Sequence, residues 1–327
     1  MGGMKIVLLG AAGFIGRIAA SFLSARPEVR ELLLVDYNIR DAKRFAKSLS
    51  PKCRWAMADV GRSPELARVL DGVDAVASAV GPCSEYEKGV LLTCGERGVS
   101  AASIGDGTLS EEERREIHDS FRRKGAAAVS GCGMMPGWTE LLSAHRLRGE
   151  VKPRRYLFCS LDRFGGYAFL RRVAKETGGD VPPPPGAPPG CYFRMGEDLF
   201  GLPAGNLTGL SRRLVAGGHR TGPVRRELSA AFLFWLRRSF ADREGAPAAA
   251  AGVWGERENG GGVTASIVDP GGRLAGLLLA EAALHLAVAK QEKGLLPLPA
   301  LIGREEAEGM ASSGGGKMAF APASSAG

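Results

Sequence analysis

Three glycines spaced three residues apart stand near the start of the chain. Gly10, Gly13 and Gly16 belong to the segment Gly-Ala-Ala-Gly-Phe-Ile-Gly, which follows the apolar run Lys5–Leu9 and opens a helical pattern over Phe14–Ser24. The first glycine permits a tight turn, the second lets the backbone approach a pyrophosphate, and the third lets the helix pack closely on a strand. Free N–H groups at the start of the helix then bind phosphate. The spacing therefore predicts a dinucleotide-binding turn whose contact residues are Gly10, Ala12, Gly13, Phe14, Ile15 and Gly16.

An acidic residue closes the second apolar run at the distance expected of a ribose ligand. Asp36 follows Glu31–Val35 and lies 20 residues beyond Gly16. A carboxylate there accepts hydrogen bonds from the adenosine ribose hydroxyls and repels a 2′-phosphate, which favours NAD. Arg40, one helical turn further on, would accommodate that phosphate, so NADP stays open. The alternative interpretations are a plain strand–helix turn for the glycines and a helix N-cap for Asp36.

The ends of the third and fourth apolar runs supply the remaining predicted cofactor contacts. Asp59 suits the amino group of adenine, and a Ser-Ala-Val-Gly-Pro turn closes the fourth run. Ligands of open α/β sheets bind outside the carboxyl ends of the strands, where these residues lie. The predicted contacts are Asp59, Val60, Ala79, Val80, Gly81 and Pro82.

Two side chains at the ends of later runs are candidates for catalysis. Asp106 follows the fifth run and is the first candidate for proton transfer or for binding a substrate ammonium group. Its alternative is an N-cap for the helix predicted over Ser110–Lys124. Cys132 follows the sixth run and is the second candidate, with a small core residue as its alternative.

The elements that must position these residues follow from hydrophobic patterning. Short apolar runs predict strands at Lys5–Leu9, Glu31–Val35, Arg54–Met57, Ala75–Val80, Val99–Ile104 and Ala126–Ser130. Helical patterns separate them at Phe14–Ser24, Arg40–Ser48, Ser63–Leu70, Glu85–Arg97 and Ser110–Lys124. This alternation predicts an α/β fold with a Rossmann-type, doubly wound parallel sheet.

The pattern changes after Gly137. A strand at Tyr156–Leu161 and a hairpin formed by Val253–Arg257 and Val263–Val268 predict a second, α+β substrate domain. The alanine-rich, strongly apolar helix Leu274–Lys290 is more apolar than a surface helix needs, so we expect it to return and pack on the first domain. The predicted divisions are 1–147 for the NAD(P)-binding domain, 148–273 for the substrate and dimerisation domain, 274–308 for the returning helix, and 309–327 for a disordered tail.

Composition and charge argue against several classes of protein. The longest apolar runs are too short to span a membrane, and six scattered cysteines with no Cys-x-x-Cys spacing predict neither a metal site nor a disulfide framework. The segment 151–243 holds 16 Lys and Arg against 7 Asp and Glu, a local excess of +9. An anionic substrate, a nucleic acid or solvated helix faces would each explain it. Because the aromatic residues there do not alternate with lysines, we predict no nucleic-acid partner.

Several motifs together resemble one known family. They are Ser78–Pro82, Cys94–Val99, the Ile104-Gly105-Asp106 strand end, and the Gly131–Gly137 turn that leads into Trp138–Leu142. In this order they resemble the saccharopine dehydrogenase-like family, with the likeness covering residues 4–147. No tyrosine of the chain is followed by lysine four positions later, which excludes the short-chain dehydrogenase pattern.

The resemblance implies an NAD(P)-dependent oxidoreductase that transfers a hydride at a carbon–nitrogen centre. Substrates of the family are amino acids or polyamines that carry carboxylates, in agreement with the basic middle segment. A related branch reduces carbon–carbon double bonds of enoyl or lipid substrates, so this reaction stays an alternative. A sensor that binds NAD(P) without turnover is another. We expect a cytoplasmic homodimer that acts on a small anionic substrate.

Overall fold

The computed structural model describes residues 3–147, 153–160, 167–203, 215, 222–236, 248–256, 262–288 and 292–323. The chain divides into two compact units, each described here by itself. The first unit comprises Met1–Gly137 and Ala275–Gly303, and the second comprises Trp138–Leu274 and Arg304–Gly327.

The first unit is built on a parallel sheet of seven strands with the order β13-β6-β5-β4-β1-β2-β3. The strands are β1 (Met4–Leu9), β2 (Val29–Asp36), β3 (Cys53–Met57), β4 (Ala75–Ser78), β5 (Ser100–Ser103), β6 (Ala127–Val129) and β13 (Gly294–Leu296). The residues Ile6–Leu9 of β1, which lies between β4 and β2, are fully buried. Burial on both faces explains the continuous apolar runs, because helices cover a doubly wound sheet on each side.

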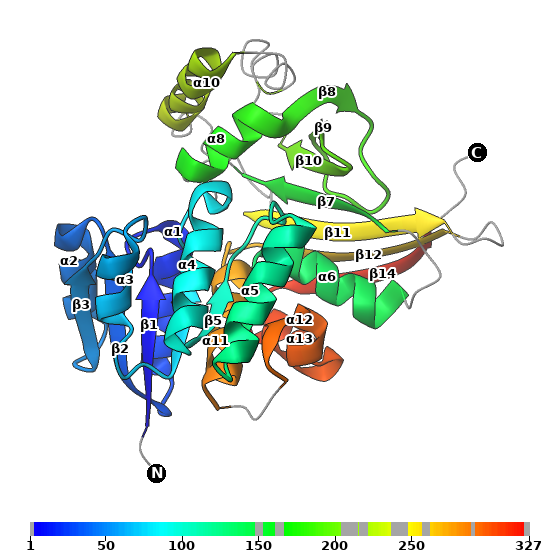
Figure 1. Ribbon diagram of the computed structural model, residues 1–327. Coiled ribbons are helices and arrows are strands. Elements are labelled where there is room, and N and C mark those ends of the chain that lie inside the picture. The colour runs from blue at the N-terminus through cyan, green and yellow to red at the C-terminus, as the bar shows by residue number, and fades with distance from the viewer. Residues whose placement is uncertain are drawn as a thin grey trace. The chain divides into compact units, whose positions relative to one another are not determined.

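Five helices connect the six strands predicted from the sequence: α1 (Phe14–Ala25), α2 (Ile39–Leu49), α3 (Ser63–Val69), α4 (Cys83–Arg97) and α5 (Glu111–Arg123). Helices α3, α4 and α5 pack in one layer, and α1 packs against α2 (Figure 1). Local sequence sets their ends. Ser110 and Glu113 form a capping box at the start of α5, and Gly98 ends α4 with a φ of +69°.

The helix α11 (Leu274–Val288) returns from the second unit and completes the first. Its leucines and alanines are buried around almost its whole circumference, and Gly276 lies so close to α1 that a Cβ there would come within 2.5 Å of the Ile18 Cγ2. Glu281 forms an ion pair with Arg26 of α1. The predicted returning helix is thus confirmed. None of the helices in the described ranges is long and apolar enough to cross a membrane.

The second unit holds a mixed sheet of seven strands in the order β14-β12-β11-β7-β10-β9-β8. The strands are β7 (Arg154–Cys159), β8 (Thr177–Val181), β9 (Cys191–Met195), β10 (Asp198–Leu202), β11 (Ala249–Glu256), β12 (Gly262–Asp269) and β14 (Lys317–Ala323). The predicted hairpin is present as β11 and β12, although Arg257 lies outside the described residues. The pair β7 and β10 is parallel, and the other neighbours are antiparallel.

Helices of the second unit pack on this sheet. The helix α6 (Thr139–Leu142) contacts β11 and β12 and continues as the wider turns of η2 (Ser143–Leu147), while α8 (Tyr167–Glu176) packs on β9 and on α10 (Pro223–Leu236). Within the sheet, the rings of Tyr156 and Tyr192 lie across Gly252 and Gly201, where a Cβ would come within 2.4 Å of each ring. These glycines let the two tyrosines form the aromatic core of the unit.

Two sequence-based boundaries differ from the structure. The predicted first domain ended at residue 147, but α6 and η2 belong to the second unit, where the Trp138 indole N–H donates to the Leu274 carbonyl. The predicted disordered tail at 309–327 is wrong for residues 309–323. The helix α13 (Arg304–Ser313) continues through residue 313, and β14 then pairs with β12 along seven residues. The backbone N–H and C=O groups of β14 pair with those of β12, so this segment is ordered although it contains few large apolar side chains.

Residues 178–190 are rich in glycine and proline, a composition that predicts an exposed loop. Their first part is instead the strand β8, which pairs with β9 at one edge of the sheet. The backbone hydrogen bonds of this pairing compensate for the weak strand preference of the two glycines in β8.

Candidate cofactor and active site

The glycine turn between β1 and α1 has the geometry that its spacing predicts. Gly10 adopts a φ of +72°, and a Cβ there would lie 2.8 Å from the Ala79 carbonyl oxygen. A Cβ on Gly16 would lie only 2.1 Å from the Gly10 carbonyl oxygen, so α1 approaches the end of β1 as closely as a helix can. Gly10 is therefore suited to its positive φ, and Gly16 allows the close approach of the helix, as the spacing predicts.

The N-terminus of α1 is open for an anion. Gly13 is its N-cap residue, no side chain caps the helix, and its first turn contains no acidic residue. Gly13 and Phe14 are exposed, while Ala12 and Ile15 are partly buried. A helix N-terminus with exposed backbone and no side-chain cap fits a pyrophosphate, because the N–H groups and the helix dipole both favour negative charge.

Asp36, at the end of β2, is tied to the glycine turn. One carboxylate oxygen accepts a hydrogen bond from the Ala12 N–H at 2.9 Å, and the other accepts one from the Asn38 N–H at 2.9 Å. The N-cap of α2 is Asn38, whose side chain accepts from the Asp41 N–H. Asp36 is therefore not the helix cap that the alternative interpretation required, and its carboxylate lies beside the turn predicted to hold the cofactor.

The residues predicted to contact the adenosine part of the cofactor are exposed at the same edge of the sheet. Arg40 is exposed on the first turn of α2, and the Tyr37 side chain is 82% exposed. Asp59 is exposed after β3, where its carboxylate accepts from the Gly61 N–H at 2.9 Å and lies 3.6 Å from the Arg62 guanidinium. Asp36 and Asp59 thus lie at the carboxyl ends of the neighbouring strands β2 and β3, as the sequence predicted.

The turn after β4 lies against the glycine turn. The Ala79 N–H donates to the Leu9 carbonyl at 3.0 Å, and the Ala79 carbonyl faces Gly10. Ala79, Val80 and Pro82 are partly buried, and Gly81 is exposed. The structure thus brings the predicted residues 79–82 to the same edge as residues 10–16.

Asp106 follows β5 and is partly exposed. Its carboxylate accepts hydrogen bonds from the Thr108 hydroxyl at 2.6 Å and the Thr108 N–H at 3.2 Å. The helix α5 is capped by Ser110, so the N-cap interpretation of Asp106 is wrong. Asp106 instead forms a small turn with Thr108 at the carboxyl edge of the sheet.

Cys132 follows β6 and is fully buried. Its N–H donates to the Ser103 carbonyl at 2.9 Å, which fixes the loop after β6 to the end of β5. Complete burial is what a small core residue would show, and a thiol that reacts with substrate needs access.

Sequence reasoning missed one acidic residue of this edge. Glu87 of α4 is buried, and its Oε1 accepts a hydrogen bond from the Ser130 hydroxyl at 2.6 Å. A signal was present in the sequence, because Glu87 precedes the buried residues Val90, Leu91 and Cys94 at helical spacings of three, four and seven. It therefore shares their buried face.

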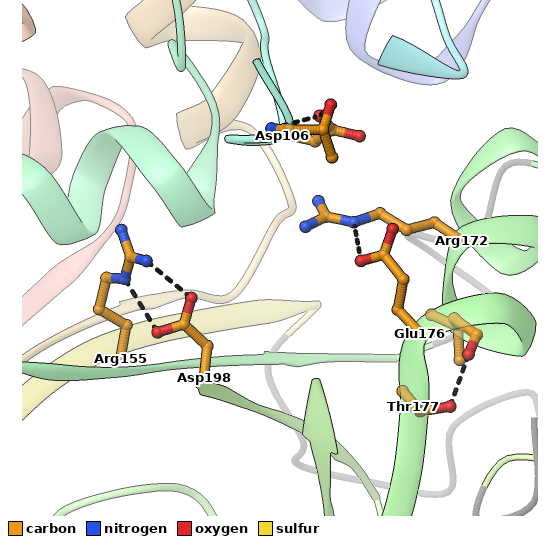
Figure 2. A network of polar contacts seen from close by, with 8 residues as sticks. Asp106, Arg155, Arg172, Glu176, Thr177 and Asp198 are labelled. Carbon is orange, nitrogen blue, oxygen red and sulfur yellow. Dashed lines mark hydrogen bonds and ion pairs between the residues drawn. The ribbon is translucent and has the colours of Figure 1, made fainter. Parts of the chain in front are cut away.

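Arginines of the second unit, expected to face an anionic substrate, take part in ion pairs of that unit. Figure 2 shows Arg155 facing Asp198, with the Nε and one terminal nitrogen each 2.9 Å from a carboxylate oxygen. Arg172 pairs with Glu176, one helical turn further along α8, at 2.9 Å. Arg171 pairs with Glu227 of α10. Much of the charge of these arginines is therefore balanced within the unit.

Comparison with known proteins agrees with the fold and the first unit. Residues 6–129 match the saccharopine dehydrogenase NADP-binding domain. The chain is similar to a carboxyaminopropylagmatine dehydrogenase of Synechocystis, with 25% identity over 163 residues. That match spans 47% of this chain and 40% of the relative, less than half of either.

Two solved structures share the whole architecture at low identity. Saccharopine dehydrogenase (L-Glu forming) from Saccharomyces cerevisiae superposes with a TM-score of 0.63 at 13% identity, covering 98% of this chain and 100% of that one. DAP dehydrogenase of C. glutamicum, in complex with DAP, superposes with a TM-score of 0.51 at 14% identity, covering 91% and 93%. The resemblance seen in the sequence motifs is thus confirmed for residues 6–129, which match the NADP-binding domain of saccharopine dehydrogenase.

Proposed function

We propose that this chain is an NAD(P)-dependent oxidoreductase that acts at a carbon–nitrogen centre of an amino-acid or polyamine-type substrate. The observation that carries the proposal is the uncapped, glycine-lined N-terminus of α1 beside Asp36. The space that a Cβ on Gly13 would occupy is the space that a pyrophosphate needs, so the residues present fit a dinucleotide. When bound, the nicotinamide supplies the hydride acceptor or donor.

Different residues of the first unit would bind different parts of the cofactor. The backbone at Gly13–Gly16 would hold the pyrophosphate, and Asp36 would accept hydrogen bonds from the ribose hydroxyls. Residues 79–82 would line the nicotinamide end of the cofactor. Asp36 supports a preference for NAD, because its carboxylate would repel a 2′-phosphate, whereas the exposed Arg40 is the group that would admit NADP.

Asp106 is our proposed partner for the proton of the reaction. Oxidation of a secondary or primary amine removes a hydride from carbon and a proton from nitrogen and leaves an imine, which water converts to a carbonyl compound and an amine. A carboxylate at the carboxyl edge of the sheet can receive that proton or bind the substrate ammonium group beforehand. We place Cys132 in the wall of the site because its side chain is buried.

The relatives' names support this substrate class. Saccharopine, DAP and carboxyaminopropylagmatine are the compounds named for the similar proteins. We propose a substrate that carries both amino and carboxylate groups. A homodimer stays a prediction, which sedimentation can check.

The test combines binding and turnover. Titration of NADH and NADPH, followed by nicotinamide fluorescence, is expected to show micromolar binding that Gly13→Asp abolishes, because its carboxylate would face the pyrophosphate. A panel of amino acids, polyamines and their conjugates is then expected to change the absorbance of the bound nicotinamide. Failure to bind either cofactor would overturn the proposal. Binding without turnover would favour a sensor, and turnover only with enoyl substrates would favour carbon–carbon reduction.

A further inference from the structure

A buried carboxyl group of the first unit lies outside the cofactor contacts described above. Glu87, on the second turn of α4, has a side chain that is only 4% exposed. Its Oε1 accepts a hydrogen bond from the Ser130 hydroxyl at 2.6 Å. Its Oε2 has no hydrogen-bond partner within the described part of the chain. An ionised carboxylate in this position would keep a full charge buried with few donors, which is unfavourable.

The position of Glu87 joins three loops of the carboxyl edge. Its helix begins at the Gly81-Pro82 turn after β4, and Ser130 directly follows β6. The loop after β5 lies against the same carboxyl group, since a Cβ on Gly105 would come within 2.9 Å of the Glu87 Oε1 and 2.6 Å of the Ser130 Oγ. With a φ of +47°, Gly105 lets this loop pass over the carboxyl group and then present Asp106.

The charges around Glu87 favour a proton on it. Burial, the largest effect, raises the pKa of Glu87, and the negative charge of Asp106 raises it further. The neighbouring hydroxyl groups of Ser130 and Ser103 lower the pKa, as does the charge of Arg114 of α5, but burial outweighs them. Two neighbouring carboxyl groups do not ionise equally. We therefore expect the proton on Glu87, which is the buried member of the pair.

We propose that Glu87 is a positioning residue of the active site, which carries a proton and holds together the loops after β4, β5 and β6. The proposal rests on the proposed role of Asp106. It predicts that ionisation of Glu87 at higher pH places a second negative charge beside Asp106 and loosens the loops that present it.

The proton on Glu87 can be tested without any substrate. An acid whose pKa is raised by folding stabilises the protein below its unfolded pKa, and this stability is lost as the pH rises to the folded pKa. The wild type should therefore lose stability above pH 4.5, the ordinary pKa of the side chain, relative to Glu87→Gln, which cannot ionise. Within that window we expect the difference in Tm to grow by about 3–5 °C per pH unit.

A matched control is Glu96→Gln, which removes an exposed carboxylate from the same helix and should follow the wild type. If Glu87→Gln does not fold, infrared spectroscopy of the wild type replaces it. A protonated carboxyl band is expected at neutral pH, and Ser130→Ala should shift its frequency. Parallel pH-dependent losses of stability in the wild type and Glu87→Gln, or the absence of that band, would overturn the proposal.

The functional part is tested by the pH profile of kcat/KM. We expect an ionisation of Glu87 in the wild-type profile, which Glu87→Gln removes. NADH affinity, measured alongside, should stay within about twofold in Glu87→Gln. A merely structural role would lower Tm without removing an ionisation, and that result would overturn the proposal. Absence of NADH and NADPH binding by the wild type would instead refute the proposed function, whereas the stability test of Glu87 would still stand.

Discussion

Gly16 offers the sharpest test of how the sequence builds the phosphate-binding turn. The substitution Gly16→Ala adds one methyl group, which would lie 2.1 Å from the Gly10 carbonyl oxygen and 2.9 Å from the Ala11 Cα. Both neighbours are backbone atoms and cannot rotate away. To reach an ordinary separation of roughly 3.5 Å from the oxygen, the methyl group must move by about 1.4 Å, and α1 must move with it.

The energetic cost follows from two opposing effects. Overpacking of a fitted contact costs about 1–3 kcal/mol, while alanine favours a helix over glycine by up to about 1 kcal/mol. We expect a net destabilisation of about 1–2 kcal/mol, which lowers Tm by about 2–4 °C per kcal/mol in a unit of this size. Displacement of the helix N-terminus should also weaken NADH binding about tenfold, equivalent to about 1.4 kcal/mol.

Gly89→Ala is the matched control for this substitution. Gly89 lies inside α4, and a Cβ there would have no atom within 4 Å. The change should raise Tm slightly and leave NADH affinity as it was, because only helix propensity is altered. Thermal unfolding and fluorescence titration of both variants measure the difference. If Gly16→Ala were as stable as Gly89→Ala and bound NADH like the wild type, close helix–strand packing would not be what requires glycine here.

Three further predictions concern polar residues. Asp36→Ala should weaken NADH binding about tenfold or more and NADPH binding less, as measured by paired titrations, because the ribose acceptor is lost together with the repulsion of a 2′-phosphate; equal losses for both cofactors would contradict this assignment. Arg155→Glu should destabilise the second unit by placing two carboxylates together, and Asp198→Arg in the same chain should restore most of the loss; urea unfolding with no restoration would refute a structural pair. Asp269 accepts from the Arg273 and Leu274 N–H groups at the start of α11, so Asp269→Ala should cost about 1–2 kcal/mol in urea unfolding, whereas an unchanged midpoint would show that the cap contributes nothing.

The first unit could be predicted largely from local sequence. Its strands are apolar runs and its helices amphipathic segments, separated by glycines and capping residues that act within a few positions of the chain. The glycine turn and Asp36 are read from spacing alone, because the β1–α1–β2 connection fixes where they meet. Even the return of α11 follows from composition, since a helix that is apolar around its whole circumference must be buried.

The remaining features depend on contacts between distant segments. The strand β14 lies 48 residues beyond the end of the partner strand β12, after a run of glycines and serines, and its pairing with β12 along seven residues makes it a strand. Likewise, β13 is a three-residue strand added to β6 across 164 residues of intervening chain. Such short segments have little preference of their own, so backbone pairing in the folded sheet decides their conformation.

For Glu87, too, the sequence predicts one property and only the folded structure decides another. The sequence places it on a helix, and its spacing to Val90, Leu91 and Cys94 indicates the buried face. Whether a buried glutamate meets a hydroxyl, a cation or another carboxyl group depends on which loops lie over that helix turn. That is set by the order of β4, β5 and β6 in the sheet, which brings Ser130 and Gly105 to its carboxyl group. The sequence determined the cofactor turn by local geometry, whereas the surroundings of the acid groups were decided by strand order, because only the folded sheet brings the ends of separate strands together.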